Sequence, residues 1–407
     1  MALTVRPYRE IGRGPPFPHG EATLVYKLYG TPGSLYTAKA RSYLIKQGLA
    51  FENRSIGDAH YRQSIMPQVG RWIMPVLEAP DGTLIQDGSV IIDTLEATGQ
   101  GRWPTFPQRP RHRVISQIFE LFGGEGLLRP AMHYRWNFDA INQPFLKRDF
   151  IATLAPGVSG EEGEAVYANA SRRMRAAMAS FGVSDASIPA VEAAWEQFLD
   201  LFDAHLAHAP YLLGGYPTLG DYGLVGPLYA HLSRDTHPGQ IMKQRAWRVW
   251  RWVERMQAAD LDTVEYGHPE PALFADDGVP DTLMALMRFI AEDYLPDITA
   301  QVGFVRQWLA ERPDLEPGTN GLARPGDRAI GKVALAWRGI PIEVGVLPYR
   351  LYLLQKVQDA VAAAGDASVG TLLEATGLTP LRDLKAQRRV ERKGHLEVWG
   401  AWLDGAA

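Results

Sequence analysis

The chain has 407 residues, of which 46% are hydrophobic and 22% charged, so it can bury a sizeable core and is not mostly disordered. Its formal net charge of −4 gives no overall basic excess of the kind that binds nucleic acid or an anionic membrane surface. The absence of cysteine excludes disulfides, a cysteine nucleophile and thiolate metal ligands, and a cytoplasmic location is expected.

The first folded unit is predicted over residues 24–100. Before it, residues 1–23 are rich in proline and glycine and lack the apolar core of a secretory signal, so we expect an N-terminal arm. The unit opens with a short strand near 24–29 and a helix over 36–48, which Gly48 ends. A second strand at 51–56 completes a β-α-β unit.

The second half of this unit is predicted to be a hairpin followed by a helix. Two short apolar runs, 74–78 and 83–85, flank an Ala-Pro-Asp-Gly turn. Asp87-Gly88-Ser89 then opens a helix that continues through Leu95. The complete order, β-α-β followed by β-β-α, matches the thioredoxin fold.

The rest of the chain is predicted to be mainly helical, in two regions at 105–265 and 281–403. Both regions have apolar residues at helical spacing. No membrane-spanning helix is expected, because no apolar run reaches about 18 residues. Expected helices in the first region lie near 109–136, 164–182, 190–208, 220–233 and 245–259. In the second they lie near 281–311 and 348–364, with a loop at 316–328 and either a helix or a hairpin at 333–346.

Three short motifs resemble the glutathione S-transferase superfamily. The segment GTPGSLYTAKARSYL resembles that family's active loop and first helix, Met74-Pro75-Val76-Leu77 resembles its V-P-x-L segment, and Asp87-Gly88-Ser89 resembles its acidic-Ser motif. The resemblance implies a thioredoxin-like domain that binds glutathione, followed by an all-α domain, over residues 24–260. Residues 281–403 look like the additional helical region of long bacterial members, whose activity the resemblance does not supply.

Two hydroxyl residues are candidates for stabilising a glutathione thiolate. A loop that leads into a helix presents free N–H groups and the positive end of the helix dipole, and both lower the pKa of a nearby thiol. Ser34 follows Pro32-Gly33 and resembles the serine of serine-type members, whereas Thr31 sits where another subgroup carries its hydroxyl. Tyr36 is a weaker candidate. The structural alternative for Ser34 is that it only caps the helix.

The resemblance also assigns residues to the body of glutathione. Pro75 sits where the family has a cis-proline, which would present the N–H and C=O of Met74 to the cysteinyl part, although a trans proline at a strand edge is the alternative. Arg71 is a candidate for the glycyl carboxylate, or only a solvated charge.

The γ-glutamyl end is expected at Asp87-Gly88-Ser89, where a helix begins and backbone N–H groups can bind a carboxylate. Asp87 is a candidate partner for the ammonium group, with a helix-terminal charge as the alternative. Gly88 departs from the family, which has a serine at this position. Ser89 either compensates for the missing hydroxyl or only caps the helix.

The helical half contains a candidate pocket and a structural motif. Tyr134, Arg135 and Trp136 follow a long helix and, with Tyr36, are predicted to line the substrate pocket, with core packing as the alternative. Thr218 and Asp221 have the spacing of a capping box, which resembles the buried helix of the family's second domain. No set of histidines is a convincing metal site.

The favoured function is a glutathione-dependent transferase, in which Ser34 or Thr31 stabilises the thiolate of the co-substrate glutathione for attack on a hydrophobic electrophile. The same thiolate would serve a lyase, an isomerase or a dehalogenase. A non-catalytic binding or regulatory module is the alternative that Gly88 favours. The resemblance implies a homodimer, with a monomer left open. The short basic run at 385–393 is predicted to be a solvated helix or turn and not a nucleic-acid patch.

Overall fold

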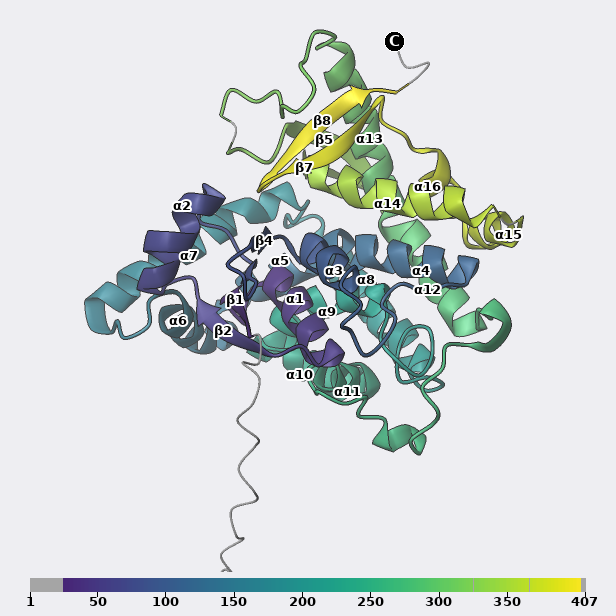
Figure 1. Ribbon diagram of the computed structural model, residues 1–407, viewed down its shortest axis with the longest axis horizontal. Coiled ribbons are helices and arrows are strands. Elements are labelled where there is room, and N and C mark those ends of the chain that lie inside the picture. The colour runs from purple at the N-terminus through teal and green to yellow at the C-terminus, as the bar shows by residue number, and fades with distance from the viewer. Residues whose placement is uncertain (1–24, 325, 366, 404–407) are drawn as a thin grey trace, which may run out of the picture.

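The computed structural model describes residues 25–324, 326–365 and 367–403 (Figure 1). The arm predicted at residues 1–23 lies outside the described residues. Within the described ranges, no helix is both long enough and apolar enough to cross a membrane. In the same ranges, no three histidine or acidic side chains are grouped so that they would hold a metal ion.

The first unit has the predicted thioredoxin-like order. Its four strands lie in the order β2-β1-β3-β4, with β1 and β2 parallel and the other pairs antiparallel. Helices α1 and α3 pack against one another beside the sheet. The elements are β1 (Tyr26–Gly30), α1 (Leu35–Gln47), β2 (Phe51–Ser55), α2 (Met66–Val69), β3 (Val76–Glu78), β4 (Leu84–Gln86) and α3 (Gly88–Glu96).

Local signals set the limits of α1. Ser34 caps its first turn, because the side chain accepts a hydrogen bond from the backbone N–H of Thr37. Gly48 ends the helix in the left-handed conformation, with φ of 68°, as the sequence predicts. Gly30 is required just before the loop, since a Cβ there would lie 2.4 Å from the side chain of Thr37.

The second region is helical, as predicted, but contains two helices that the sequence patterns did not indicate, α6 and α10. The predicted helix at 109–136 is interrupted by a π-helical turn, Phe122–Gly126, which separates α4 from α5. The helices are α4 (Pro110–Leu121), α5 (Leu128–Trp136), α6 (Asp139–Leu154), α7 (Gly160–Ala177), α8 (Ile188–His205), α9 (Leu219–Ala230), α10 (Thr236–Arg245) and α11 (Trp247–Arg255).

The central helix α9 begins with the predicted capping box. The carboxylate of Asp221 accepts hydrogen bonds from the backbone N–H groups of Thr218 and Leu212, each at 2.9 Å, and from the Trp252 indole at 3.2 Å. Burial raises the pKa of Asp221 to about 6, although these donors act in the opposite direction. The box therefore fixes the start of a helix whose surroundings exclude water.

Helices make up most of the regular structure of the third region, as predicted, but the region also contains two β-hairpins. Residues 333–346 belong to one hairpin, and most of the basic run at 385–393 lies in a second one, where Arg388 and Val390 point inward and their neighbours outward. The elements are α12 (Asp281–Asp293), α13 (Leu295–Ala310), β5 (Gly331–Trp337), β6 (Ile340–Val346), α14 (Pro348–Ala364), α15 (Ala367–Thr376), α16 (Pro380–Asp383), β7 (Arg388–Lys393) and β8 (Leu396–Trp402).

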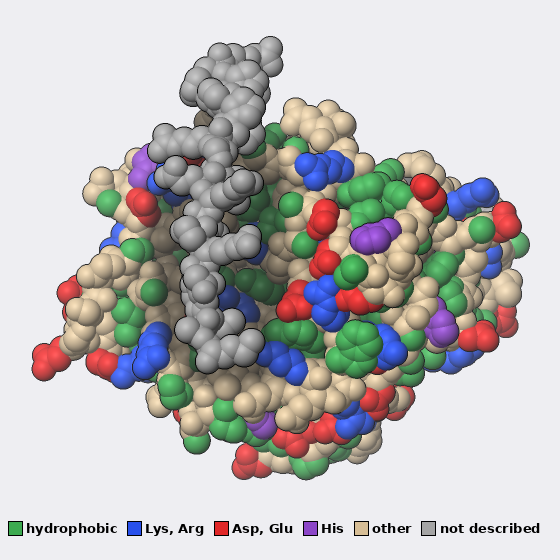
Figure 2. All heavy atoms as spheres, turned by 90° about the horizontal axis from the view of Figure 1, so that it is seen from below, with side chains coloured by type: hydrophobic (Ala, Val, Ile, Leu, Met, Phe, Trp, Pro, Cys, Tyr) green, Lys and Arg blue, Asp and Glu red, His purple; other side chains and the backbone are tan. Residues whose placement is uncertain are grey.

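Helix α14 joins this region to the other two. It packs along α4, and Figure 1 shows it beside α3 and α4 with the β7–β8 hairpin, in yellow, above. The ammonium group of Lys356 lies 2.5 Å from the carboxylate of Asp93 on α3. Where grey atoms do not cover it, the face of the molecule shown in Figure 2 has acidic, basic and apolar side chains interspersed.

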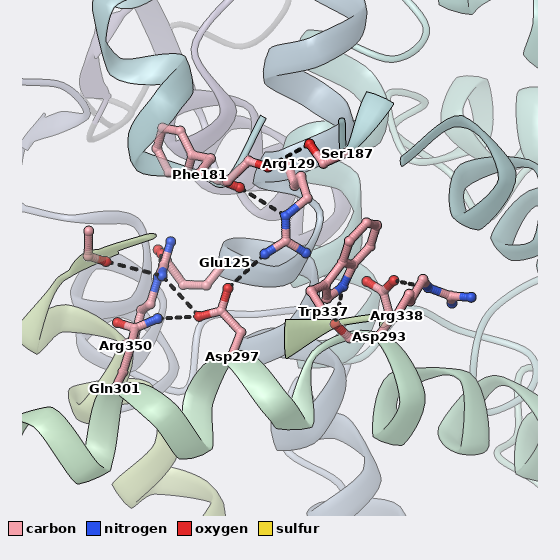
Figure 3. A network of polar contacts seen from close by, with 12 residues as sticks. Glu125, Arg129, Phe181, Ser187, Asp293, Asp297, Gln301, Trp337, Arg338 and Arg350 are labelled. Carbon is pink, nitrogen blue, oxygen red and sulfur yellow. Dashed lines mark hydrogen bonds and ion pairs between the residues drawn. The ribbon is translucent and has the colours of Figure 1, made fainter. Parts of the chain in front are cut away.

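A buried charge network secures the junction (Figure 3). Arg350 on α14 donates to Glu125 at 3.1 Å and to Asp297 on α13 at 3.4 Å. Arg129 on α5 donates to the other oxygen of Asp297 at 2.8 Å and to the carbonyl oxygen of Phe181 at 2.9 Å. All four charged side chains are almost completely excluded from solvent, so each charge depends on its partners.

Candidate functional site

The two hydroxyl candidates of the active loop differ in what they contact. The Ser34 oxygen accepts the capping hydrogen bond from the Thr37 N–H at 3.3 Å, but its own hydroxyl proton has no acceptor among the described residues. The Thr31 hydroxyl is buried and donates to the sulfur of Met74 at 3.7 Å. Capping and thiol contact are thus compatible for Ser34, because the first uses a lone pair and the second uses the proton.

The start of α1 offers further donors beside Ser34. The backbone N–H groups of Leu35 and Tyr36 have no partner among the described residues. Such groups at a helix N-terminus carry the positive end of the helix dipole. A thiolate next to Ser34 would therefore meet one hydroxyl donor and a positive potential.

The Met74–Pro75 peptide bond is cis, as predicted. The backbone N–H and C=O of Met74 have no partner in the described parts of the chain, although the neighbouring Pro75 carbonyl accepts from the Asp87 N–H at 3.3 Å. An unpaired donor and acceptor on one residue can pair with an extended peptide as a neighbouring strand would. Met74 therefore has the unpaired backbone groups that the predicted pairing with the cysteinyl part of glutathione requires.

Asp87 caps α3 and keeps one oxygen free. Its Oδ1 accepts from the backbone N–H groups of Ser89 at 2.9 Å and Val90 at 3.3 Å, and from the hydroxyl of Tyr349 at 3.2 Å. Its Oδ2 has no partner among the described residues. Asp87 has φ of 92°, which is uncommon for a residue other than glycine. The free oxygen remains available to an ammonium group.

Residue 88 packs closely against α1. A Cβ at Gly88 would lie 3.2 Å from the carbonyl oxygen of Tyr36 and 3.4 Å from the side chain of Lys39, so a serine would crowd α1. The backbone N–H of Gly88 has no partner among the described residues and can still donate to a carboxylate. The departure from the family pattern therefore removes a hydroxyl but keeps a donor.

The hydroxyl of Ser89 lies in a buried polar cluster instead of in the open part of the site. It lies 2.7 Å from the Lys39 ammonium group and donates to Glu120 at 2.7 Å. Burial acts to raise the pKa of Glu120, but the ammonium group of Lys39 holds that pKa below its usual value. The hydroxyl of Ser89 thus stabilises an internal ion pair, and it does not replace the one missing at position 88.

The third region frames this site. The Arg71 guanidinium donates to the carbonyl oxygen of Gly326 at 2.6 Å, and Arg392 on β7 donates to the side chain of Gln86 at 2.6 Å. The ring of His395, in the β7–β8 turn, lies 2.7 Å from the carbonyl oxygen of Val69. Arg71 is still partly exposed, so its predicted contact with the glycyl carboxylate stays a prediction.

Tyr36 connects the active loop to the buried charge network. Its hydroxyl donates to Glu125 at 3.2 Å, and its ring meets that of Tyr349 edge to face at 6.4 Å. Burial raises the pKa of the Tyr36 phenol, and Glu125 raises it further. A phenol held neutral and bonded to a carboxylate is a poor partner for a thiolate, which agrees with its lower rank in the sequence interpretation.

The prediction that Tyr134, Arg135 and Trp136 line the substrate pocket is corrected by their burial, since each is only 2% exposed. Tyr134 and Trp136 pack in the core among other aromatic rings. Arg135 pairs with Asp235 at 2.7 Å and donates to the carbonyl oxygen of Gly33 at 2.9 Å. Arg135 therefore stabilises the active loop through its hydrogen bond to the Gly33 carbonyl.

The sequence interpretation missed Tyr349 and Glu125, which bond to Asp87 and Tyr36 respectively, and Arg328, which lies against the ring of Tyr349. Tyr349 and Glu125 lie in predicted helices and Arg328 ends a predicted loop, but nothing in the local pattern indicates which distant segment each of them meets.

Comparison with known proteins agrees with the motifs. Residues 28–103 match the family described as glutathione S-transferase, N-terminal domain. No curated protein matches the sequence of the chain.

Solved structures resemble the chain only distantly. The β-etherase LigF from Sphingobium sp. strain SYK-6 is 19% identical, with a TM-score of 0.40, over 59% of this chain and 99% of its own. A glutathione S-transferase from Methylobacterium radiotolerans, in complex with glutathione sulfonate, is 20% identical, with a TM-score of 0.34, over 63% and 100%. Glutathione transferase GSTFuA3 from Phanerochaete chrysosporium is 14% identical, with a TM-score of 0.40, over 58% and 97%. These likenesses are too distant to transfer an activity.

The family match covers the same segment in which the strands and helices follow the thioredoxin-like order. The match spans the sheet from β1 onward and the helix that Asp87 caps. The chain therefore contains a glutathione S-transferase N-terminal domain over residues 28–103.

Proposed function

We propose that the chain binds reduced glutathione and lowers the pKa of its thiol, so that the thiolate attacks a hydrophobic electrophile. The observation that carries the proposal is a set of polar groups in the three motifs that have no partner among the described residues. They are the Ser34 hydroxyl proton, the backbone N–H and C=O of Met74, the N–H of Gly88 and one carboxylate oxygen of Asp87. Each has the chemistry that one part of glutathione requires.

The reacting sulfur would lie at the N-terminus of α1. The hydroxyl of Ser34 would donate to it, and a hydrogen bond to the charged form of an acid lowers its pKa. The unpaired N–H groups of the first helical turn add a positive potential at no cost in reorganisation. Ser34 is therefore proposed as the residue that contacts the thiol, with Thr31, whose hydroxyl already has an acceptor, as the weaker candidate.

Calorimetric titration with reduced glutathione at pH 7 and pH 8 tests the proposal. Saturable binding with proton release at pH 7 is expected, because the bound thiol would ionise below its solution pKa. Repeating the titration in buffers of different ionisation enthalpy measures the number of protons released. Absence of binding would contradict the proposal.

The reaction that follows thiolate formation is proposed to be transfer to the electrophile. Cleavage, isomerisation and dehalogenation begin with the same attack, so residues around the sulfur do not separate them. Product analysis with a panel of electrophiles distinguishes them by the group that leaves, by whether glutathione stays joined to a product, and by whether the substrate is only rearranged. The homodimer that the family resemblance implies also stays a prediction, which sedimentation of the full chain checks against a monomer.

A non-catalytic binding module is the second candidate. Tyr349 already bonds to Asp87, and Gly326 already accepts from Arg71, so the third region holds two of the groups proposed for glutathione. Under this alternative, glutathione would not bind and residues 281–403 would carry a partner surface. The same titration decides between the two functions.

A further inference from the structure

Tyr349 places the third region inside the candidate glutathione site. It lies in the first turn of α14, and its hydroxyl is 3.2 Å from Asp87 Oδ1 and 3.4 Å from the Ser89 oxygen. Its ring contacts Tyr36 on α1. A side chain from the C-terminal region therefore lies between the helices that begin at the two glutathione motifs.

Two guanidinium groups lie against the ring of Tyr349. The central carbon of Arg328 is 5.4 Å from the ring centre, and that of Arg392 is 5.7 Å from it. Both also pair with one carboxylate, that of Glu397, which Arg328 meets at 3.2 Å. Two positive charges thus share one negative charge at the edge of the site.

The two arginines differ in how many of their donors are in use. Arg392 uses both terminal nitrogens, one on Glu397 and the other on Gln86. Arg328 bonds to Glu397 through Nη2 only, and its Nη1 has no partner in the described parts of the chain. The side chain of Arg328 is 30% exposed, so solvent or a ligand can reach that nitrogen.

The loop that carries Arg328 is held next to the segment before Met74. The hydrogen bond from Arg71 to the carbonyl oxygen of Gly326, at 2.6 Å, ties the two segments together two residues before Arg328. Positive charge is needed here, because Asp87 and Glu125 are both acidic groups at the site. A ligand carboxylate next to Asp87 would otherwise be repelled.

We infer that Arg328 binds the γ-glutamyl carboxylate of glutathione, so that residues 281–403 complete the site that the N-terminal domain begins. Gly88 supplies a backbone donor to this carboxylate but no hydroxyl, and the hydroxyl of Ser89 is turned to Lys39 and Glu120. The free Nη1 of Arg328 supplies the charged donor that position 88 lacks. The inference rests on the proposed binding of glutathione.

The experiment compares Arg328→Met with Arg324→Met in the full chain. Arg324 is a matched control, because it lies in the same loop, its side chain is 84% exposed and it pairs with Asp327. Three ligands are titrated by calorimetry: glutathione, its analogue without the γ-glutamyl carboxylate, and its glycyl ethyl ester. Thermal unfolding of each variant reports whether the chain remains folded.

For the wild type, we expect removal of the γ-glutamyl carboxylate to weaken binding about tenfold, or about 1.4 kcal/mol. Arg328→Met should weaken binding of glutathione by a similar factor but bind the analogue as the wild type does. It should also keep the full effect of esterifying the glycyl carboxylate. Arg324→Met should resemble the wild type with all three ligands.

Each contrary result has a distinct meaning. If the wild type binds glutathione and Arg328→Met binds it equally well, the inference fails while the proposed function stands. An equal loss for glutathione and for the analogue would mean that Arg328 acts on structure alone, which also overturns the inference. Loss of discrimination against the ethyl ester instead would place Arg328 at the glycyl end. No binding by the wild type would refute the proposed function and the inference with it.

Discussion

Replacing Arg350 by methionine tests the buried charge network that joins α14 to the rest of the molecule. Arg350 is 2% exposed and bonds to Glu125 at 3.1 Å and to Asp297 at 3.4 Å. Methionine fills much of the same space, so the main change is the loss of a positive charge and its donors. Both carboxylates would stay buried.

The size of the destabilisation depends on which partners each carboxylate retains after the substitution. Removing one partner of a buried ion pair typically costs about 3–5 kcal/mol, because the other charge is left uncompensated. Asp297 retains Arg129 at 2.8 Å, whereas among the described residues Glu125 retains a hydrogen bond only from the hydroxyl of Tyr36, at 3.2 Å. We therefore expect a loss near the lower end, about 3 kcal/mol in the free energy of unfolding, with most of it arising at Glu125.

The loss should depend on pH. Burial raises the pKa of Glu125 above its usual value, and Arg350 acts against this rise, so the substitution should raise the pKa further. An acid whose folded pKa exceeds its unfolded value loses stability as pH rises from the unfolded pKa through the folded one. The deficit of Arg350→Met should therefore be smaller at about pH 5 than at about pH 7.

Urea unfolding is the suitable assay, since urea is uncharged and does not screen ion pairs. The variants are Arg350→Met, Glu125→Gln and their combination, which should be less destabilised than the sum of the two single changes. Arg389→Met is the control, because Arg389 pairs with Asp359 at 2.6 Å on the surface of the same region. Its loss should stay below about 1 kcal/mol.

The reasoning would be refuted if Arg350→Met cost no more than Arg389→Met. It would also be refuted if the two single changes were additive, because the pair would then not interact. A deficit that is the same at both pH values would show that Glu125 is not the group left uncompensated.

Three further substitutions address the site and the packing. Ser34→Ala should raise the pKa of the bound glutathione thiol, followed by ultraviolet absorbance of the thiolate, and leave affinity largely intact; an unchanged pKa would remove Ser34 from the proposed role. Asp87→Ala should weaken glutathione binding several-fold in a calorimetric titration, and unaltered affinity would contradict its assignment to the ammonium group. Gly223→Ala would place a Cβ 2.5 Å from the Cα of Glu120 and should cost about 1–3 kcal/mol in urea unfolding. The matched change Gly303→Ala, which meets open space, should cost nothing; equal losses would show that the close approach of α9 and α4 is not the cause.

The sequence by itself determined the thioredoxin-like order of the first unit and several details within it. The end of α1 at Gly48, the cis bond before Pro75 and the capping box at Thr218 and Asp221 were all predicted correctly. These features depend on a few neighbouring residues, such as a glycine with positive φ or a side chain that bonds to a backbone N–H three residues away. Features of this kind can therefore be predicted from the local sequence.

The secondary structure of the third region was predicted less well. A basic run with one acidic residue suggested a helix or turn at 385–393, yet most of it forms β7, with Arg388 buried beneath Trp402 and Val390 beside Trp399. The alternation of inward and outward residues in β7 extends over only a few positions. It is hard to recognise in the sequence because one of the inward residues is an arginine. A partner strand, β8, favours the extended conformation, because pairing with it satisfies the backbone groups of β7.

Only the tertiary structure decided which residues surround the candidate site. Tyr349 and Asp87 are 262 residues apart in the chain, and Arg350 and Glu125 are 225 apart. Burial and contact depend on which helices pack together. This packing places Tyr134, Arg135 and Trp136 in the core and places Tyr349 at the candidate site. Helical spacing shows that a face is apolar, but the element that covers that face is chosen by long-range packing, which a local pattern does not contain.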